Sequence, residues 1–123
     1  MAGGQVMSLE ESLRVEAPKV SAPRVRNLLI KAGLNKAAFT GWVYANSGFK
    51  VGKLHVAPGE DKVMVEYMTQ HVYGVMSRED NLRQAANRQK LLRRYSEVLQ
   101  EAGLKVTAVE YSEGGNLAYL LVG

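Results

Sequence analysis

The stretch from residue 78 to residue 102 constrains the fold more than any other part of the chain, because its side chains repeat with the period of a helix. Side chains that can face a core recur every three or four residues and would line one side of such a helix. They are Leu82, Ala85, Ala86, Gln89, Leu92, Tyr95, Leu99 and Ala102. Ser77 and Asp80 form an S-x-x-D pair that caps a helix N-terminus, and Gly103 is typical of a C-terminus. We therefore expect one long helix packed on the core along this stripe.

A shorter helix is predicted at residues 22–33. Ser21 is a good N-cap, and Pro23 falls in the first turn, where its missing N–H costs nothing. Apolar residues again fall on one face, namely Val25, Leu28, Leu29 and Ala32. Gly33 suits the left-handed residue that ends a helix.

The rest of the sequence reads as strands separated by turns. Three runs rich in β-branched and aromatic residues, 38–46, 49–57 and 62–75, are separated by the turn sequences NSG and PGED and predict a β-meander. Residues 105–123 predict a hairpin around the turn EGGN. The last strand, residues 117–122, is apolar on both faces and is expected inside the sheet.

These elements predict an α+β fold in the order α-β-β-β-α-β-β. We expect a mostly antiparallel sheet of about five strands with two helices on one face. The other face of the sheet would be open to solvent or to a partner. Residues 1–18 are small, polar and weakly periodic, and we expect them to form a flexible N-terminal arm before a single α+β domain at residues 19–123.

The sequence offers little that could carry catalysis. It has no cysteine, and its two histidines, His55 and His71, both fall in predicted strands. Their spacing with Glu66 does not predict convergence on a metal ion. No phosphate-binding glycine loop and no pair of catalytic carboxylates is recognisable. We expect a non-catalytic protein with no metal site and no cofactor.

The longest apolar runs fall far short of the roughly 20 residues that a membrane-spanning helix needs. The N-terminal residues lack the basic and apolar regions of a secretory signal. Together with the lack of cysteine, this pattern predicts a cytoplasmic protein that does not enter a membrane.

Charge is distributed unevenly along the chain, and this is its strongest indication of function. The net charge is +4, yet residues 19–53 contain seven lysines and arginines and no acid. Residues 78–94 add six basic residues against two acids. Cations gathered on one surface bind nucleic acid, because each neutralised phosphate releases condensed counterions. The sequence therefore predicts nucleic-acid binding, DNA or RNA, mainly through phosphate contacts.

The predicted site combines these cations with two aromatic residues. The candidate phosphate contacts are Arg24, Arg26, Lys31, Lys50, Lys53, Arg88, Lys90 and Arg94. Trp42 and Phe49 are the candidates for stacking on unpaired bases. The hypothesis requires the two basic blocks to converge on one face of the molecule.

Other interpretations remain open at the level of sequence. Trp42 and Tyr44 share one face of a predicted strand, so they fit a core position as well as a stacking surface. Cations on the outer face of a helix are often simply solvated. The chain could instead be a protein-interaction or oligomerisation module, as a subunit or an inhibitor that docks on an acidic partner surface.

Overall fold

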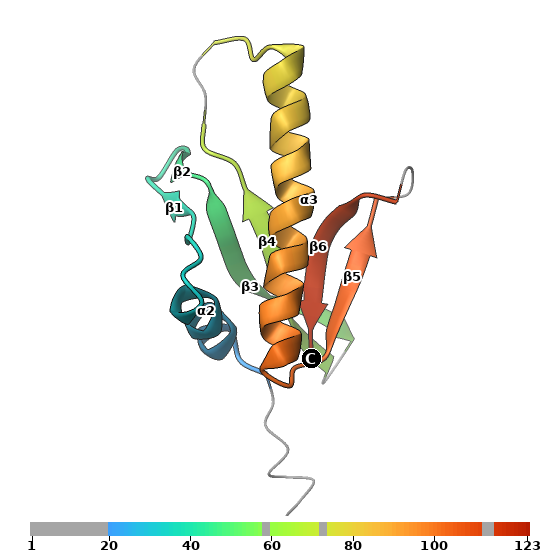
Figure 1. Ribbon diagram of the computed structural model, residues 1–123. Coiled ribbons are helices and arrows are strands. Elements are labelled where there is room, and N and C mark those ends of the chain that lie inside the picture. The colour runs from blue at the N-terminus through green and yellow to red at the C-terminus, as the bar shows by residue number, and fades with distance from the viewer. Residues whose placement is uncertain (1–19, 58–59, 72–73, 112–114) are drawn as a thin grey trace, which may run out of the picture.

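The computed structural model describes residues 20–57, 60–71, 74–111 and 115–123. Figure 1 shows one long helix lying across a four-stranded antiparallel sheet, with a short helix and a two-stranded ribbon beside it. The fold is α+β, as the sequence predicts. In chain order, the elements are α2 (Ala22–Lys31), β1 (Ala38–Phe39), β2 (Tyr44–Asn46), β3 (Gly48–Ala57), β4 (Glu60–Met68), α3 (Arg78–Glu101), β5 (Val106–Glu110) and β6 (Leu117–Val122). The predicted arm at residues 1–18 lies outside the described residues.

The two helices in the described part of the chain, α2 and α3, begin and end where the local sequence places them. The Ser21 hydroxyl accepts the N–H of the residue three positions later at 3.3 Å, and the Ser77 hydroxyl does the same at 3.1 Å. Gly33 and Gly103 follow the helices with φ angles of +84° and +88°, which an L side chain adopts only with strain. The capping signals in the sequence are thus confirmed at all four helix ends.

The main sheet has the strand order β3-β4-β6-β5, and every neighbouring pair is antiparallel. Strand β6 lies between β4 and β5, so Leu121 pairs with Met64 on one side and with Thr107 on the other. The interior position expected for residues 117–122 is confirmed. An apolar strand suits this place because it is paired along both edges, and its Leu120 and Val122 are buried in the core.

The prediction of a single strand at residues 38–46 is wrong. The segment folds back on itself as the β1–β2 ribbon, which is separate from the main sheet. The turn forms because Gly41 has a φ of +99° and because the Thr40 N–H and hydroxyl both donate to the Val43 carbonyl, at 2.9 and 3.0 Å. Local hydrogen bonds therefore override the β propensity of the run.

The strand predicted at residues 62–75 is also shorter than expected, because β4 ends at Met68. Met68 pairs with Gly48, the first residue of β3, so the partner strand offers nothing further to pair with. The next residues turn away, and the Gln70 N–H donates to the Ser47 hydroxyl at 2.7 Å. The chain then runs as a connection to α3.

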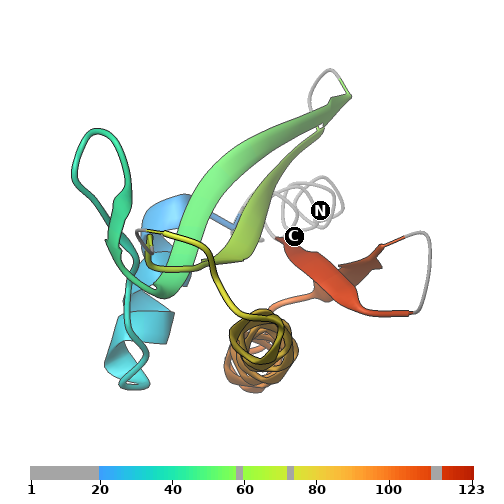
Figure 2. The same ribbon diagram turned by 90° about the horizontal axis from the view of Figure 1, so that it is seen from above.

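Both helices contribute to one core against the sheet, and Figure 2 shows α3 end-on in front of it. The fully buried large side chains are Val25, Leu29, Phe49, Val65, Leu92, Tyr95, Leu99, Leu120 and Val122. Phe49 and Tyr95 meet edge to face, with ring centroids 5.9 Å apart. Each such side chain contributes about 1.5–3 kcal/mol by leaving water.

Alternation along the strands fixes which residues lie on the opposite, open face of the sheet. Phe49 points toward the helices, so its neighbour Lys50 lies on the open face. Lys50 pairs across the sheet with Glu66, and Met64 pairs with Leu121 in the same way. The open face thus combines apolar residues with both signs of charge.

Candidate binding surface

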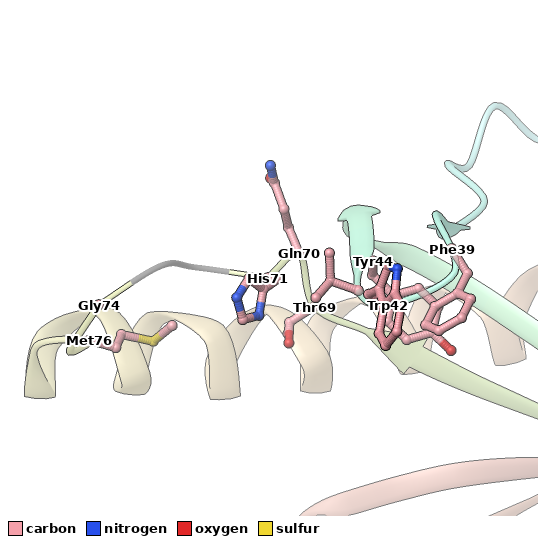
Figure 3. A pocket seen from close by; sticks show the side chains of 9 residues that line it. Phe39, Trp42, Tyr44, Thr69, Gln70, His71, Gly74 and Met76 are labelled. Atoms are coloured by element: carbon pink, nitrogen blue, oxygen red, sulfur yellow. The ribbon is translucent and has the colours of Figure 1, made fainter.

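An aromatic hollow of about 410 Å³ lies between the β1–β2 ribbon and the β4–α3 connection, as Figure 3 shows. Trp42 and Phe39 are 92% and 59% exposed. Phe39 also meets Tyr44 edge to face, with ring centroids 5.0 Å apart. Val43 completes the lining from the ribbon, and the connection contributes Thr69, Gln70, His71, Gly74 and Met76. Exposed rings gathered around a concave surface are characteristic of binding sites.

Two hydrogen bonds, one between backbone groups and one from a side chain, hold the walls of the aromatic hollow together. The His71 N–H donates to the Tyr44 carbonyl at 3.0 Å, which ties the connection to β2. The Asn46 side chain donates to the Lys36 carbonyl at 2.8 Å, which ties β2 to the segment that enters the ribbon. The hollow is therefore built by segments that are far apart in the sequence.

A second, polar hollow of about 300 Å³ adjoins the first, because Gln70 and Met76 line both. Its remaining wall comes from Ser47 and Tyr67 and from the first half of α3, at Asp80, Arg83, Gln84 and Asn87. The two hollows thus lie next to each other, and the second one reaches the surface of α3.

A cationic stripe runs along α3 from this point. The cations Arg83, Lys90 and Arg94 form it. The uncharged Asn87 lies between the first two, and successive steps of four, three and four residues place all four on one side of the helix. All four are exposed. From Arg83 to Arg94 the helix rises about 16 Å, at about 1.5 Å per residue, so the stripe can contact several consecutive phosphates.

Two carboxylates lie within reach of the stripe. Arg83 contacts Asp80 at 2.9 Å and Arg94 contacts Glu97 at 3.5 Å, and all four side chains are about half exposed or more. Exposed pairs of this kind contribute little free energy and are readily exchanged for another anion. Within the described part of the chain, Lys90 forms no ion pair.

The two predicted stacking residues have opposite environments. Trp42 is exposed, so the alternative that it belongs to the core is wrong, whereas Tyr44 is half-buried. Phe49 is 0% exposed and packs on Tyr95, so it cannot stack on a base, and its prediction as a stacking residue is wrong. Phe39, which was not among the predicted stacking residues, lines the hollow together with Trp42 instead.

The structure brings only some of the predicted cations together. Lys90 and Arg94 belong to the stripe, but Arg88 is half-buried on the side of α3 that carries Leu92. Lys50 lies on the open face of the sheet, on the far side of the core from α3. Arg24, Arg26, Lys31 and Lys53 lie on α2 and β3 and line neither hollow. The first basic block is thus spread over several surfaces.

Within the residues that the structure describes, no three His, Asp or Glu side chains are placed to hold a metal ion. His71 lines the aromatic hollow, whereas the side chain of His55 lies outside the described part. Among the described helices, none has the length and apolar character needed to cross a membrane.

Comparison with known proteins identifies no relative. No family model, no curated protein and no solved structure matches this chain. The function is therefore argued from the two hollows and the cationic stripe.

Proposed function

We propose that this protein is a non-catalytic module that binds single-stranded nucleic acid. Bases stack on Trp42 and Phe39, and phosphates contact the cationic stripe of α3. The observation that carries the proposal is the 92% exposure of Trp42 in a hollow that leads onto that stripe.

The aromatic hollow suits bases because a base can stack on a ring whatever its sequence. Such stacking is worth about 1–3 kcal/mol per base. Trp42 and Phe39 are held on a ribbon whose turn is fixed by Thr40 and Gly41, so the rings are presented by an ordered backbone. Little conformational freedom is then lost when a base binds.

The stripe supplies the electrostatic part of the interaction. Arg83 lines the polar hollow, and Lys90 and Arg94 continue along the same side of α3 beyond it. The chain as a whole has a net charge of +4 and a pI near 9.4, which favours association with a polyanion. The proposed path runs from the ribbon, past Met76, to the stripe.

A single strand fits this path better than a duplex. Bases in a duplex are stacked on one another, so their faces are hidden from protein rings. Trp42 and Phe39 can stack only on bases that are already unpaired. The proposed ligand is therefore single-stranded DNA or RNA.

The tryptophan itself provides the test, because Trp42 is the only one in the chain. Titration with short single-stranded oligonucleotides should quench its fluorescence, and anisotropy of a labelled oligonucleotide should report the same affinity. Raising salt from about 50 to about 200 mM should weaken binding steeply. Duplexes of the same sequence should bind more weakly.

Two variants serve as test and control. Trp42→Ala should reduce affinity at least about fivefold, since it removes one stacking ring. Lys50→Ala removes a cation from the open face of the sheet and should leave affinity within about twofold. The proposal is wrong if no single strand binds at low salt, or if both variants weaken binding equally.

The second candidate function, docking on an acidic protein surface, uses the same features. Tryptophan and arginine are the residues most often found at the energetic centre of protein interfaces. The exposure of Trp42 and Phe39 near Arg83 is consistent with docking on an acidic protein surface. It predicts no quenching by oligonucleotides, together with quenching of Trp42 by an acidic protein partner.

A further inference from the structure

The polar hollow next to the aromatic hollow has a lining that suits the edge of a base rather than its face. We infer that it receives one unpaired nucleobase and reads its edge, with a preference for adenine. This inference rests on the proposed function, because the strand reaches the polar hollow from the aromatic one. The two hollows share Gln70 and Met76, so they would hold neighbouring bases of one strand.

Three of the residues that line this hollow carry carboxamides. Gln84 and Asn87 lie one turn apart on α3, and Gln70 of the connection is also among the lining residues. In the described part of the chain, the side chains of Gln84 and Asn87 make no hydrogen bond. Each carboxamide presents donors and an acceptor in one plane. Asparagine and glutamine pair through both groups with N6 and N7 of adenine.

The charged groups of the hollow are already engaged with each other. The Arg83 guanidinium donates to the Asp80 carboxylate at 2.9 Å. A free arginine would favour guanine, and a free carboxylate would favour cytosine. A strand that leaves this pair intact meets the carboxamides as the groups that select its base, and Lys90 and Arg94 then supply the phosphate contacts.

The size of the hollow agrees with a ligand of one base. Its volume of about 300 Å³ stands at the lower end of the range for ligand sites. Tyr67, only 8% exposed, lines it from the sheet. The Ser47 hydroxyl is held by the Gln70 N–H at 2.7 Å, which fixes the wall where the two hollows meet.

The test compares single-stranded homopolymers of adenine and of thymine, by quenching of Trp42 and by anisotropy. The adenine strand should bind the wild-type protein about tenfold more tightly, the size of one good bidentate contact. Asn87→Ala and Gln84→Ala should each remove most of this preference and leave thymine binding within about twofold. Gln100→Ala is the matched control, since Gln100 is an exposed amide of α3 that lines neither hollow.

Loss of the adenine preference in Asn87→Ala but not in Gln100→Ala supports the inference. Equal binding of both homopolymers by the wild-type protein overturns it and leaves the proposed function intact. An equal loss of affinity for both strands in Asn87→Ala also overturns it. If neither strand binds at low salt, the inference falls together with the proposed function.

Discussion

Gln89 on α3 and Leu117 at the start of β6 are joined by two hydrogen bonds in opposite directions. The Gln89 Nε2 donates to the Leu117 carbonyl at 3.0 Å, and the Leu117 N–H donates to Gln89 Oε1 at 2.7 Å. The side chain thus acts as a strand partner for β6 and fixes α3 on the sheet. The cationic stripe and one wall of the polar hollow depend on this placement.

Replacing Gln89 should destabilise the protein. Gln89→Ala removes both hydrogen bonds to the Leu117 backbone in a half-buried site, at a cost of about 1–3 kcal/mol. Urea denaturation followed by circular dichroism measures the change. Gln100→Ala, an exposed amide on the same helix, should change stability by less than about 0.5 kcal/mol. Equal effects of the two variants would show that the pairing with Leu117 contributes nothing.

Gly48→Ala should destabilise the fold by about 3 kcal/mol, because overpacked backbone cannot relax freely. A Cβ at Gly48 would lie 2.7 Å from the Ala37 nitrogen and would also clash with the Asn35 carbonyl oxygen. The matched control is Gly52→Ala on the same strand, where a Cβ meets nothing within 4 Å. Gly52→Ala should be neutral or slightly stabilising. Thermal unfolding of both variants distinguishes a close backbone approach from a general intolerance of β3 to substitution.

The stability of the protein should fall in alkaline solution because of Tyr95. Burial, with a smaller contribution from Tyr67, raises the pKa of the Tyr95 hydroxyl well above its usual range. The folded protein then holds this proton more tightly than the unfolded chain, so the stabilisation is complete below about pH 10 and declines as the pH rises further. Denaturant unfolding between neutral pH and about pH 11 should show this decline, and Tyr95→Phe should reduce it. An identical pH profile in Tyr95→Phe would contradict the assignment to Tyr95.

Single charge removals on the stripe should change the salt dependence of oligonucleotide binding. Lys90→Ala and Arg94→Ala should each reduce the magnitude of the negative slope of log K against log salt by about 0.7, the value per phosphate contact on a single strand. Arg24→Ala, on α2, lines neither hollow and should leave the slope unchanged. A slope that changes equally in all three variants would mean that the whole charge of the protein, rather than the stripe, attracts the strand.

Phe39→Ala should weaken binding without unfolding the protein. Phe39 is 59% exposed, so its removal should change stability by less than about 1 kcal/mol. The loss of a stacking surface should reduce oligonucleotide affinity about fivefold or more. If Phe39→Ala binds as tightly as the wild-type protein while Trp42→Ala binds more weakly, the stacking surface consists of the tryptophan alone.

The candidate site could be predicted only in part from the sequence. Its signals were the aromatic residues around Trp42 and the run of cations in α3, and both contribute to the surface that the structure shows. Phe39 lies only three residues before Trp42, but the turn at Thr40 that gathers the two rings depends on hydrogen bonds rather than on residue type. Gln70 and Asn87 line one hollow although they lie 17 positions apart in the sequence, and spacing along the chain does not predict this arrangement.

The sequence by itself determined the elements that depend on neighbouring residues. The caps at Ser21 and Ser77 and the helix ends at Gly33 and Gly103 are local, because each needs only hydrogen bonds or φ angles within one turn. The tertiary structure alone decided which aromatic residue is buried and which cation belongs to the site. Phe49 and Trp42 have the same apolar character, but pairing of β3 with β4 turns Phe49 under the helices, while the ribbon carries Trp42 into solvent. The physical reason is that the burial of a side chain depends on segments distant in the chain. Tyr95 of α3 packs on Phe49, whereas Trp42, in the turn between β1 and β2, is 92% exposed.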